Sequence, residues 1–272
     1  MVYDIEKIKE VVLKIKPLFQ NREESSQVKV KGVADFVTAV DTHVQKYMQE
    51  ELAKLYPEVQ LMGEEKDNSD IDYSKAVWIL DPVDGTTNLI HDFHGSSLSL
   101  GLAVNKQIIL GIIYNPDTGE IFWAEKGKGA FLQIEGSDNK KQIHVSTVSE
   151  MGNALIGCGA SPYNKKWAKL NFETFEKIFE DVADFRRIGS AAIEMAYVAS
   201  GRMESYLEAK LNPWDYAAGK IIVEEAGGKV TTYDGDDFDP TTVRSIVASN
   251  GIIGDKLTSK YLPSEQDFFG MV

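Results

Sequence analysis

The chain has 272 residues, of which 43% are hydrophobic and 26% are charged. This composition is typical of a globular protein with a buried core, and the length suits one large domain or two smaller ones. Acidic residues outnumber basic ones by 42 to 29, and no basic run is longer than a pair, so no nucleic-acid partner is expected. No run of about 18 apolar residues is present, so we do not expect a membrane span.

Two features indicate the cellular compartment. Residues 1–10 have neither the basic region nor the apolar region of a secretory signal. The only cysteine, Cys158, cannot form a disulfide within the chain, and its apolar neighbours favour a buried small side chain over a nucleophile. We therefore expect a protein of the reducing cytoplasm.

Hydrophobic periodicity predicts an α/β chain, which some schemes would class as α+β. Apolar residues recur every three or four positions over residues 5–19 and 44–55, which predicts two helices, the second ending before Pro57. The period then changes to that of strands, which are predicted over residues 59–62, 77–80, 97–104, 107–114, 120–125 and 130–134.

The pattern begins again after a polar stretch over residues 140–150. Strands are predicted over residues 154–159, 184–188 and 204–209, and helices over residues 167–179, 189–201 and 213–228. The tail from Pro263 is weakly patterned, and we expect it to be mobile. We predict an N-terminal α+β half, residues 1–145, and a C-terminal α/β half, residues 146–272.

The stretch WILDPVDGTTNL, residues 78–89, places two carboxylates at the end of a hydrophobic strand. A strand, a sharp turn and a helix start present backbone N–H groups to an anion, but Asp81 and Asp84 would repel that anion unless a cation lay between them. Carboxylate oxygens are the ligands that Mg²⁺ prefers. The motif alone leaves an alternative open, in which Asp84 or Thr86 only caps the following helix.

Other acidic residues also fall at the ends of predicted elements. Glu64 and Glu65 follow a strand, Asp41 precedes the second helix, and Asp215 lies in the first turn of an apolar helix. Taken singly, each has a structural explanation, such as a favourable interaction with a helix dipole. Taken together, they lie where an α/β protein carries its chemistry.

Competing motifs are incomplete. His91 and His94 have the spacing of metal ligands but no third nitrogen or sulfur ligand nearby, so we expect surface imidazoles. The chain has no phosphate-binding loop of the form GxxxxGK followed by Ser or Thr. The acidic stretch over residues 233–240 lacks the spacing of a calcium-binding loop and favours a solvated turn.

Three motifs together resemble the inositol monophosphatase family of metal-dependent, lithium-sensitive sugar phosphatases. They are GEE at residues 63–65, WILDPVDGTTN at residues 78–88 and WDYAAGKIIVEEAGG at residues 214–228. Residues 35–41 and 186–201 match more loosely, and Leu89 stands where the family usually has an aromatic residue. The resemblance covers roughly residues 30–230 and implies a layered αβαβα fold, with the site between the two halves.

The resemblance also implies roles for individual residues, with two or three Mg²⁺ ions per site. The implied metal ligands are Glu64, Asp81, the backbone carbonyl of Val83, Asp84 and Asp215. Thr86 and Glu64 would position and deprotonate the attacking water, and Asp41 would orient Thr86. A third, weaker ion would depend on Glu64 and water.

Further residues are implied to contact the substrate. The N–H groups of Gly85 and Thr86 would hold the phosphate, with Asp84 and Asp215 bordering it. Glu208 and the backbone at Ser190 and Ala191 would contact the alcohol. Either Lys29 or Lys31 would reach the site from a nearby loop, and the spacing leaves both open. The role of Glu65 is likewise left open.

The resemblance therefore predicts a Mg²⁺-dependent phosphomonoesterase that hydrolyses inositol monophosphate or a similar small polyol phosphate by direct attack of a metal-activated water, as a homodimer. Alternatives within the superfamily are a fructose-1,6-bisphosphatase and a nucleotide phosphatase acting on NADP or 3′-phosphoadenosine 5′-phosphate. Arg186 and Arg187 would bind a second phosphate in the first case, or lie at an interface or on the surface. An alternative from a different class is a metal-binding regulatory protein.

Overall fold

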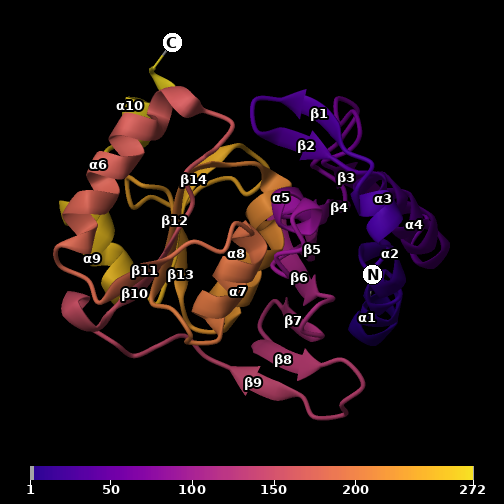
Figure 1. Cartoon of the computed structure of the whole chain (residues 1–272). Coiled ribbons are helices and arrows are strands. Elements are labelled where there is room, and N and C mark those ends of the chain that lie inside the picture. Colours follow the sequence, from indigo (N-terminus) through magenta and orange to yellow (C-terminus); the bar gives the residue numbers. More distant parts are fainter. Residues whose placement is uncertain (1–2, 272) are drawn as a thin grey trace.

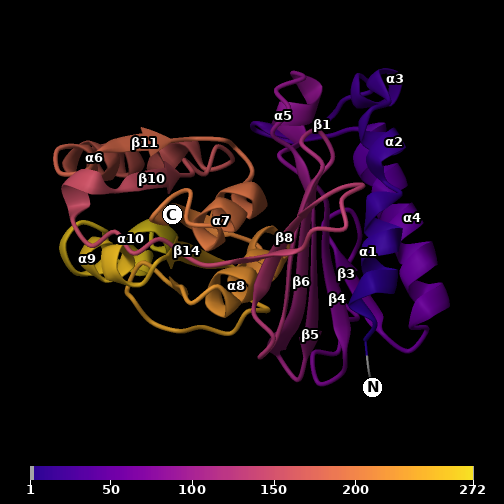
Figure 2. The same ribbon diagram turned by 90° about the horizontal axis from the view of Figure 1, so that it is seen from below.

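The computed structural model describes residues 3–271, and its N-terminal helices form an outer layer beside a large sheet (Figure 2). These helices are α1 (Ile5–Leu13), α2 (Lys16–Phe19), α3 (Arg22–Ser25) and α4 (Ala39–Leu55). The opening helix was predicted as one element but is divided, because Pro17 has no N–H and its ring would clash with the carbonyl of Leu13. Both pieces still bury the expected apolar face against α4 and the sheet.

Seven strands form the second layer. They are β3 (Gln60–Gly63), β4 (Val77–Asp84), β5 (Ser97–Val104), β6 (Gln107–Asn115), β7 (Glu120–Glu125), β8 (Ala130–Ile134) and β9 (Lys141–Ile143). Neighbours in the sheet follow the order of the chain; β3 and β4 are parallel, and the other pairs are antiparallel. The six strands predicted between residues 59 and 134 are confirmed. Every residue of β4 is buried, because helices cover both faces of the sheet.

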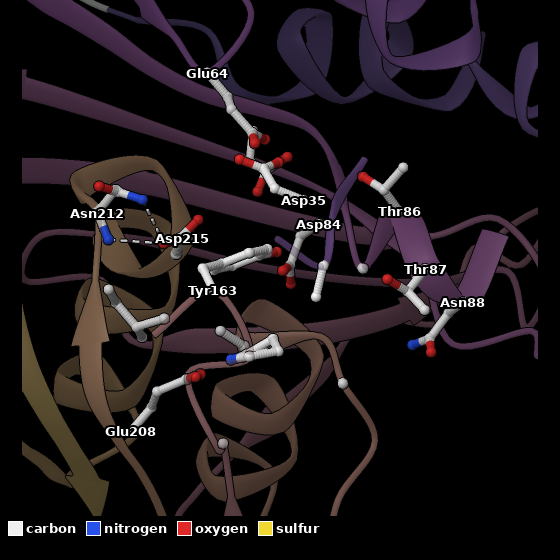
Figure 3. Close-up of a pocket in the computed structure, with 18 of the residues that line it drawn as sticks. Asp35, Glu64, Asp84, Thr86, Thr87, Asn88, Tyr163, Glu208, Asn212 and Asp215 are labelled. Carbon is white, nitrogen blue, oxygen red and sulfur yellow. Dashed lines mark hydrogen bonds between the residues drawn. The ribbon is translucent and has the colours of Figure 1, made fainter. Parts of the chain in front are cut away.

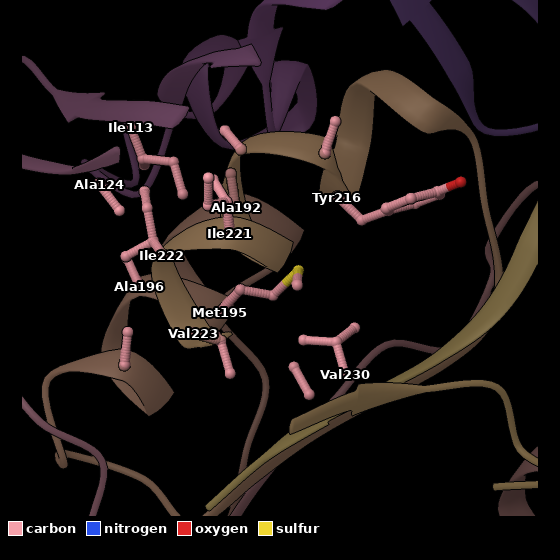
Figure 4. Close-up of a cluster of buried hydrophobic side chains, with 14 of the residues drawn as sticks. Ile113, Ala124, Ala192, Met195, Ala196, Tyr216, Ile221, Ile222, Val223 and Val230 are labelled. Atoms are coloured by element: carbon pink, nitrogen blue, oxygen red, sulfur yellow. The ribbon is translucent and has the colours of Figure 1, made fainter. Parts of the chain in front are cut away.

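Two helices from the C-terminal half form the middle layer, α7 (Ala191–Ala199) and α8 (Pro213–Glu225), which lie between the two sheets (Figures 1 and 2). A helix covered on both sides must be apolar nearly all round, and most residues of both helices are buried. Figure 4 shows Met195 of α7 and Ile222 of α8 in one cluster with Ile113 of the large sheet. The two halves of the chain therefore share a hydrophobic core.

A smaller sheet and three helices complete the stack. In spatial order the strands are β11 (Asp184–Arg186), β10 (Leu155–Cys158), β12 (Ser205–Leu211), β14 (Arg244–Ser249) and β13 (Lys229–Thr231). The outer helices are α6 (Ala168–Phe179), α9 (Ile252–Lys260) and α10 (Glu265–Phe269), and two 3₁₀ turns, η1 (Met151–Asn153) and η2 (Lys165–Trp167), precede β10 and α6. This arrangement confirms the layered αβαβα class.

The C-terminal tail departs from the prediction. Instead of an irregular mobile segment, it forms α10 and buries Phe268 completely against Trp167 and Tyr233. One aromatic side chain anchors this helix, and a single residue produces no periodic signal. The proposed division at residue 145 stays a prediction; the change from the first sheet to the second falls between Ile143 and Leu155. No helix in residues 3–271 is long and apolar enough to cross a membrane.

Candidate active site

A cavity of about 540 Å³ opens between the two halves of the chain (Figure 3). It lies where β4 turns into α5 (Thr86–Ile90), opposite the start of α7 and α8 and the end of β12. The predicted site residues in its wall are Glu64, Asp81, Val83, Asp84, Gly85, Thr86, Ala191, Glu208 and Asp215. The two others, Asp41 and Ser190, lie fully buried directly behind the wall. The structure thus brings together residues from six separate stretches of sequence.

Gly85 makes the sharp turn at the end of β4. Its φ of +88° lies in the left-handed region that favours glycine. A Cβ at this position would lie 3.1 Å from the carbonyl oxygen of Gly189 and 3.2 Å from that of Gly95. The absence of a side chain therefore lets the β4–α5 corner approach the segment that leads into α7. The predicted strand, turn and helix start are confirmed.

Asp84 connects this corner to the other half of the chain. Its Oδ2 accepts hydrogen bonds from the Ser190 hydroxyl at 2.5 Å and from the Ala192 N–H at 2.7 Å, both at the start of α7. Gly85 occupies the N-cap position of α5, and no side chain caps that helix. The interpretation of Asp84 or Thr86 as a cap of the following helix was therefore wrong, because Asp84 caps a helix distant in the sequence instead.

Thr86 is held by a buried carboxylate. Its hydroxyl lies 2.9 Å from Oδ1 of Asp41 and 3.1 Å from the carbonyl oxygen of Val83, and its single hydrogen can be donated to one of them at a time. The other carboxylate oxygen of Asp41 accepts from the Thr38 N–H at 2.8 Å and the Thr38 hydroxyl at 2.6 Å, in a capping box that starts α4. Asp41 is thereby fixed and aimed at Thr86.

Lys31 supplies the positive charge beside the acidic residues. It lies on an exposed hairpin of β1 (Lys29–Gly32) and β2 (Asp35–Val37), and its Nζ is 3.4 Å from Oε1 of Glu64. It also donates a hydrogen bond to Oε1 of Glu65, whose backbone N–H is held by Gln45. Of the two candidate lysines, the structure therefore places Lys31 at the site, and Glu65 is its ion-pair partner.

Asp215 combines two roles in one side chain. Its Oδ2 accepts a hydrogen bond of 2.7 Å from the N–H of Asn212 in a capping box that starts α8, so the structural explanation is correct. The carboxylate also lines the cavity (Figure 3). Because an ionised carboxylate has about four lone-pair sites, helix capping leaves it free to bind a further group.

Burial raises the pKa values of four carboxyl groups in the cavity wall, those of Glu64, Asp81, Asp84 and Asp215. Burial raises the pKa of Glu64 to about 7, with Lys31 opposing this shift and Glu65 adding to it. Burial raises the pKa of Asp84 to about 6, although the hydrogen bonds from Ser190 and Ala192 favour its charged form.

The pKa values of Asp81 and Asp215 are also raised, first by burial and then by the charge of Glu64. Glu64 and three aspartates thus share a low-dielectric space, in which Lys31 pairs with Glu64 alone of the four. Like charges in such a space are costly unless a cation joins them.

The chemistry of the donors suits a hard divalent cation, because all of them are oxygens. Within residues 3–271, no three His, Cys, Asp or Glu side chains are gathered closely enough to hold a metal ion as they stand. Glu64 is paired with Lys31. The residues fit a cation by type and by burial. His91 and His94 are exposed, as predicted.

The opposite wall is formed by the C-terminal half. Glu208 is only 8% exposed; its Oε1 accepts from the Ser161 N–H at 2.8 Å, and its Oε2 accepts from the Tyr206 hydroxyl at 2.6 Å. Arg187 lines the cavity, whereas Arg186 pairs with Asp184 on the surface at 2.5 Å. The two adjacent arginines therefore have different surroundings.

Sequence reasoning missed several residues of this wall. Tyr163 and Asn164, in the loop after β10, and Lys210, on β12, all line the cavity. Asn88 was also missed; its Nδ2 donates to the carbonyl of Ile188 at 2.9 Å and so ties α5 to the segment before α7. No periodic pattern marks a loop residue, so the only available signal was proximity to the predicted strand end.

The fold and the cavity together define a class of protein, a layered αβαβα protein with an acidic cavity between its two halves. The model of the inositol monophosphatase family matches residues 2–266. This chain therefore belongs to the inositol monophosphatase family, and it is a phosphatase, a hydrolase of phosphate esters. The family is generally metal-dependent, and its substrates are small phosphorylated compounds.

Individual relatives cover most of the chain. The inositol-1-monophosphatase of Caulobacter vibrioides is 37% identical over 225 residues, which are 82% of this chain and 86% of that protein. The Nus factor SuhB of Escherichia coli strain K12 is 34% identical over 205 residues, 75% of this chain and 74% of that protein. The solved structure of a Thermotoga maritima IMPase has a TM-score of 0.80 at 30% identity, and covers 92% of this chain and 93% of its own.

Proposed function

We propose that this phosphatase hydrolyses inositol monophosphate or a similar small polyol phosphate, that it depends on Mg²⁺, and that water attacks the phosphorus directly. The observation that carries the proposal is the gathering of Glu64, Asp81, Asp84 and Asp215 at one cavity beside the Thr86–Asp41 pair. Relatives named inositol-1-monophosphatase support the choice of substrate class.

Two or three cations would be held by the acidic wall. Glu64, Asp81 and the carbonyl of Val83 would bind one, and Asp81, Asp84 and Asp215 would bind another; a third would depend on Glu64 and water. When bound, the cations lower the pKa of a water molecule and neutralise charge on the phosphate and the leaving oxygen. The uncompensated burial of these carboxylates supports this assignment.

Thr86 and Glu64 position the attacking water. When the Thr86 hydroxyl donates its hydrogen to Asp41, the lone pairs of Oγ1 can accept a hydrogen from water. Glu64 then takes the proton of the attacking water as general base. The N–H groups of Gly85 and Thr86 hold the phosphate oxygens, since the first N–H groups of a helix have no partner within it.

The substrate alcohol is placed against the C-terminal wall. The Glu208 carboxylate has about four lone-pair sites, and Ser161 and Tyr206 occupy two of them. It can therefore still accept hydrogen bonds from substrate hydroxyls. The backbone at Ser190 and Ala191 approaches the alcohol from the start of α7. Because Ser190 also bonds to Asp84, this contact couples the alcohol side to the cation side.

A turnover assay over a panel of phosphate esters tests the proposal. With Mg²⁺ present, inositol 1-phosphate is expected to be hydrolysed with a higher kcat/KM than fructose 1,6-bisphosphate, NADP or 3′-phosphoadenosine 5′-phosphate. A clear preference for one of the last three would replace the inositol assignment with a bisphosphatase or a nucleotide phosphatase.

The second candidate function is hydrolysis of a bisphosphate, because Arg187 and Lys210 both line the cavity beyond the acidic wall. These two positively charged side chains would favour a second phosphate on the substrate. A higher kcat/KM for fructose 1,6-bisphosphate that falls in an Arg187→Ala variant would support it.

A regulatory role is the alternative from a different class, and the relative named as a Nus factor gives it some basis. A protein that only binds metal for regulation has no need of the Thr86–Asp41 pair. Binding of Mg²⁺ without turnover of any ester would favour regulation, whereas turnover that depends on Thr86 would favour catalysis.

We also propose that the protein is a cytoplasmic homodimer. A contiguous aromatic patch on α6 and β11 supports an interface between copies: Phe172 and Phe179 are 62% and 56% exposed, and both lie within aromatic contacts that include Phe175 and Phe185. The molar mass in solution tests this, and the double variant Phe172→Ser, Phe179→Ser is expected to yield monomers.

The buried, unpaired Cys158 is consistent with a reducing compartment.

A further inference from the structure

Tyr163 enters the active-site cavity from the C-terminal half, next to two carboxylates of the acidic wall. It belongs to the loop between β10 and η2, and Figure 3 shows its side chain extending into the cavity, between Asp215 and Asp84. The residue as a whole is 59% exposed, so its ring is open to the cavity mouth. The inward-pointing end is the hydroxyl. Burial of this end, followed by the charges of Asp215, Glu64 and Glu208, raises its pKa.

The loop that carries Tyr163 is held firmly by Glu208 and β12. The N–H of Gly159 donates to the carbonyl of Leu207 at 2.8 Å, and a Cβ on Gly159 would come within 2.1 Å of Oε2 of Glu208. The N–H of Ser161 donates to the other oxygen of Glu208 at 2.8 Å. These contacts fix the loop at a point where only glycine fits.

Ser161 adds a second sign that the loop shape is imposed. Its φ of +44° is in the left-handed region, which is unfavourable for a residue with a side chain, and its carbonyl accepts from the N–H of Asn164 at 2.9 Å. Such a conformation persists where the surroundings over-determine it, and it is concentrated at ligand sites. The turn therefore presents Tyr163 to the cavity in a defined position.

The Tyr163 phenol is a donor without a partner. Among the described residues, its hydroxyl forms no hydrogen bond to the protein. A phenol is protonated at neutral pH, so this hydroxyl can donate to a ligand. Glu208, which lines the same cavity, offers an acceptor. A donor and an acceptor on the same wall match the hydroxyls of a ring-shaped polyol, each of which can accept and donate.

We propose that Tyr163 is a specificity-determining residue, whose hydroxyl donates a hydrogen bond to a ring hydroxyl of a cyclic polyol phosphate and whose ring packs on the C–H face of that polyol. This inference rests on the proposed function, since it places the ester between the acidic wall and the loop. Glu208 then has an additional role as a positioning residue, because it holds the loop through Ser161. A site built around such a bond discriminates against esters that lack the hydroxyl.

Tyr163→Phe isolates the hydroxyl, because it keeps the ring. We expect kcat/KM for inositol 1-phosphate to fall about threefold to tenfold, the range of one hydrogen bond. The value of kcat/KM for p-nitrophenyl phosphate and the inhibition constant of inorganic phosphate are expected to stay within about twofold, because neither ligand carries a polyol ring hydroxyl. Tyr47→Phe is the matched control; its hydroxyl contacts the carbonyl of Val11 at 3.4 Å, outside the cavity.

Different outcomes separate this inference from the function on which it rests. Equal losses for both esters, or no loss for either, would overturn the role of Tyr163 while leaving the phosphatase assignment in place. A nucleotide preference that survives Tyr163→Phe but not Tyr163→Ala would mean that the ring stacks on a base, and would also overturn it. A wild-type protein that hydrolyses neither ester would overturn the proposed function, and this inference with it.

Discussion

The two walls of the active-site cavity are built in different ways. On the phosphate side, Asp81 and Asp84 belong to a strand whose every residue is buried, so their positions are fixed by the core of the large sheet. On the alcohol side, Tyr163 and Arg187 lie in segments between regular elements and are exposed. In the proposed mechanism, the step common to all esters is thus tied to the core, whereas the choice between esters depends in part on side chains from two connecting segments.

Removal of metal acts on the phosphate side alone, and we expect it to cause the largest loss of activity. Dialysis against EDTA is expected to abolish hydrolysis of every ester, and added Mg²⁺ to restore it, because all the proposed ligands are oxygens. Activity that survives exhaustive chelation would contradict the metal assignment. Li⁺ is expected to inhibit by replacing a weakly held cation, and unchanged rates at high Li⁺ would weaken that part of the resemblance.

Asp84→Asn separates a ligand from a helix cap. The amide keeps an oxygen that can accept from Ser190 and Ala192, but it removes a charge, so turnover should fall for all esters by orders of magnitude, beyond the roughly 10- to 100-fold typical of outer-shell losses. The melting temperature should hardly change, because the amide oxygen can still accept both hydrogen bonds. Asp4→Asn, at the cap of α1, is the matched control. Equal, small losses of activity in both variants would mean that Asp84 only caps a helix and does not bind metal.

Thr86→Ala tests the positioning of water. Without the hydroxyl, turnover of all esters is expected to fall about 100-fold, near the lower end of general-base contributions. The dissociation constant of Mg²⁺ should stay nearly unchanged, because no proposed metal ligand is altered. Calorimetric titration measures this constant. Weaker Mg²⁺ binding with normal turnover at saturating Mg²⁺ would argue that Thr86 supports the metals instead.

The raised pKa values predict how the stability of the metal-free protein varies with pH. Because the folded-state pKa is about 7 for Glu64 and about 6 for Asp84, above the usual carboxyl range, these groups stabilise the fold fully below about pH 4, and this contribution is lost as the pH rises to 7. In EDTA, the melting temperature should therefore be lower at pH 8 than at pH 5.5, and Mg²⁺ should raise it more at pH 8.

Glu64→Gln should flatten this pH dependence, because it removes one of the raised groups. Glu58→Gln, on the surface, serves as the control for the general effect of net charge. If both variants show the same slope as the wild type, the acidic wall does not govern the pH dependence of stability.

The smallest effect is expected on the alcohol side. Arg187→Ala should change kcat/KM for inositol 1-phosphate by no more than about twofold, because a monophosphate leaves no second anion for the guanidinium to bind. Activity on fructose 1,6-bisphosphate should fall further if that ester is a substrate. Arg186→Ala, which breaks only a surface pair with Asp184, is the control. A large loss for inositol 1-phosphate would place Arg187 on the phosphate side of the cavity.

The phosphate side could be predicted from the sequence because its residues are contiguous with strong periodic patterns. Asp81 and Asp84 stand where a run of strand formers stops, and Asp215 opens an apolar helix, so both the elements and the acids carry local signals. The contact between Asp84 and Ser190 spans 106 positions and depends on packing between the halves. No local pattern encodes a contact between residues so far apart, which is why the alternative left open for Asp84 named the following helix and not α7.

The alcohol side shows the limit of the same reasoning. Tyr163 lies in a loop without periodicity. On the phosphate side, the choice of Lys31 over Lys29 likewise depends on how a two-stranded hairpin folds over the site. Helices and strands were predicted well where they bury a regular face, and poorly where one residue anchors an element, as Phe268 does for α10.

The bond from Asp84 to α7 also has a consequence for biosynthesis. During translation the large sheet emerges first and has most of the acids, but Ser190, Ala192 and Asp215 are still in the ribosome or unfolded. A half-made chain would therefore lack the partners that hold Asp84 and would have no second half to close the cavity. In cell-free synthesis, phosphatase activity is therefore expected to appear only after the last layers have docked.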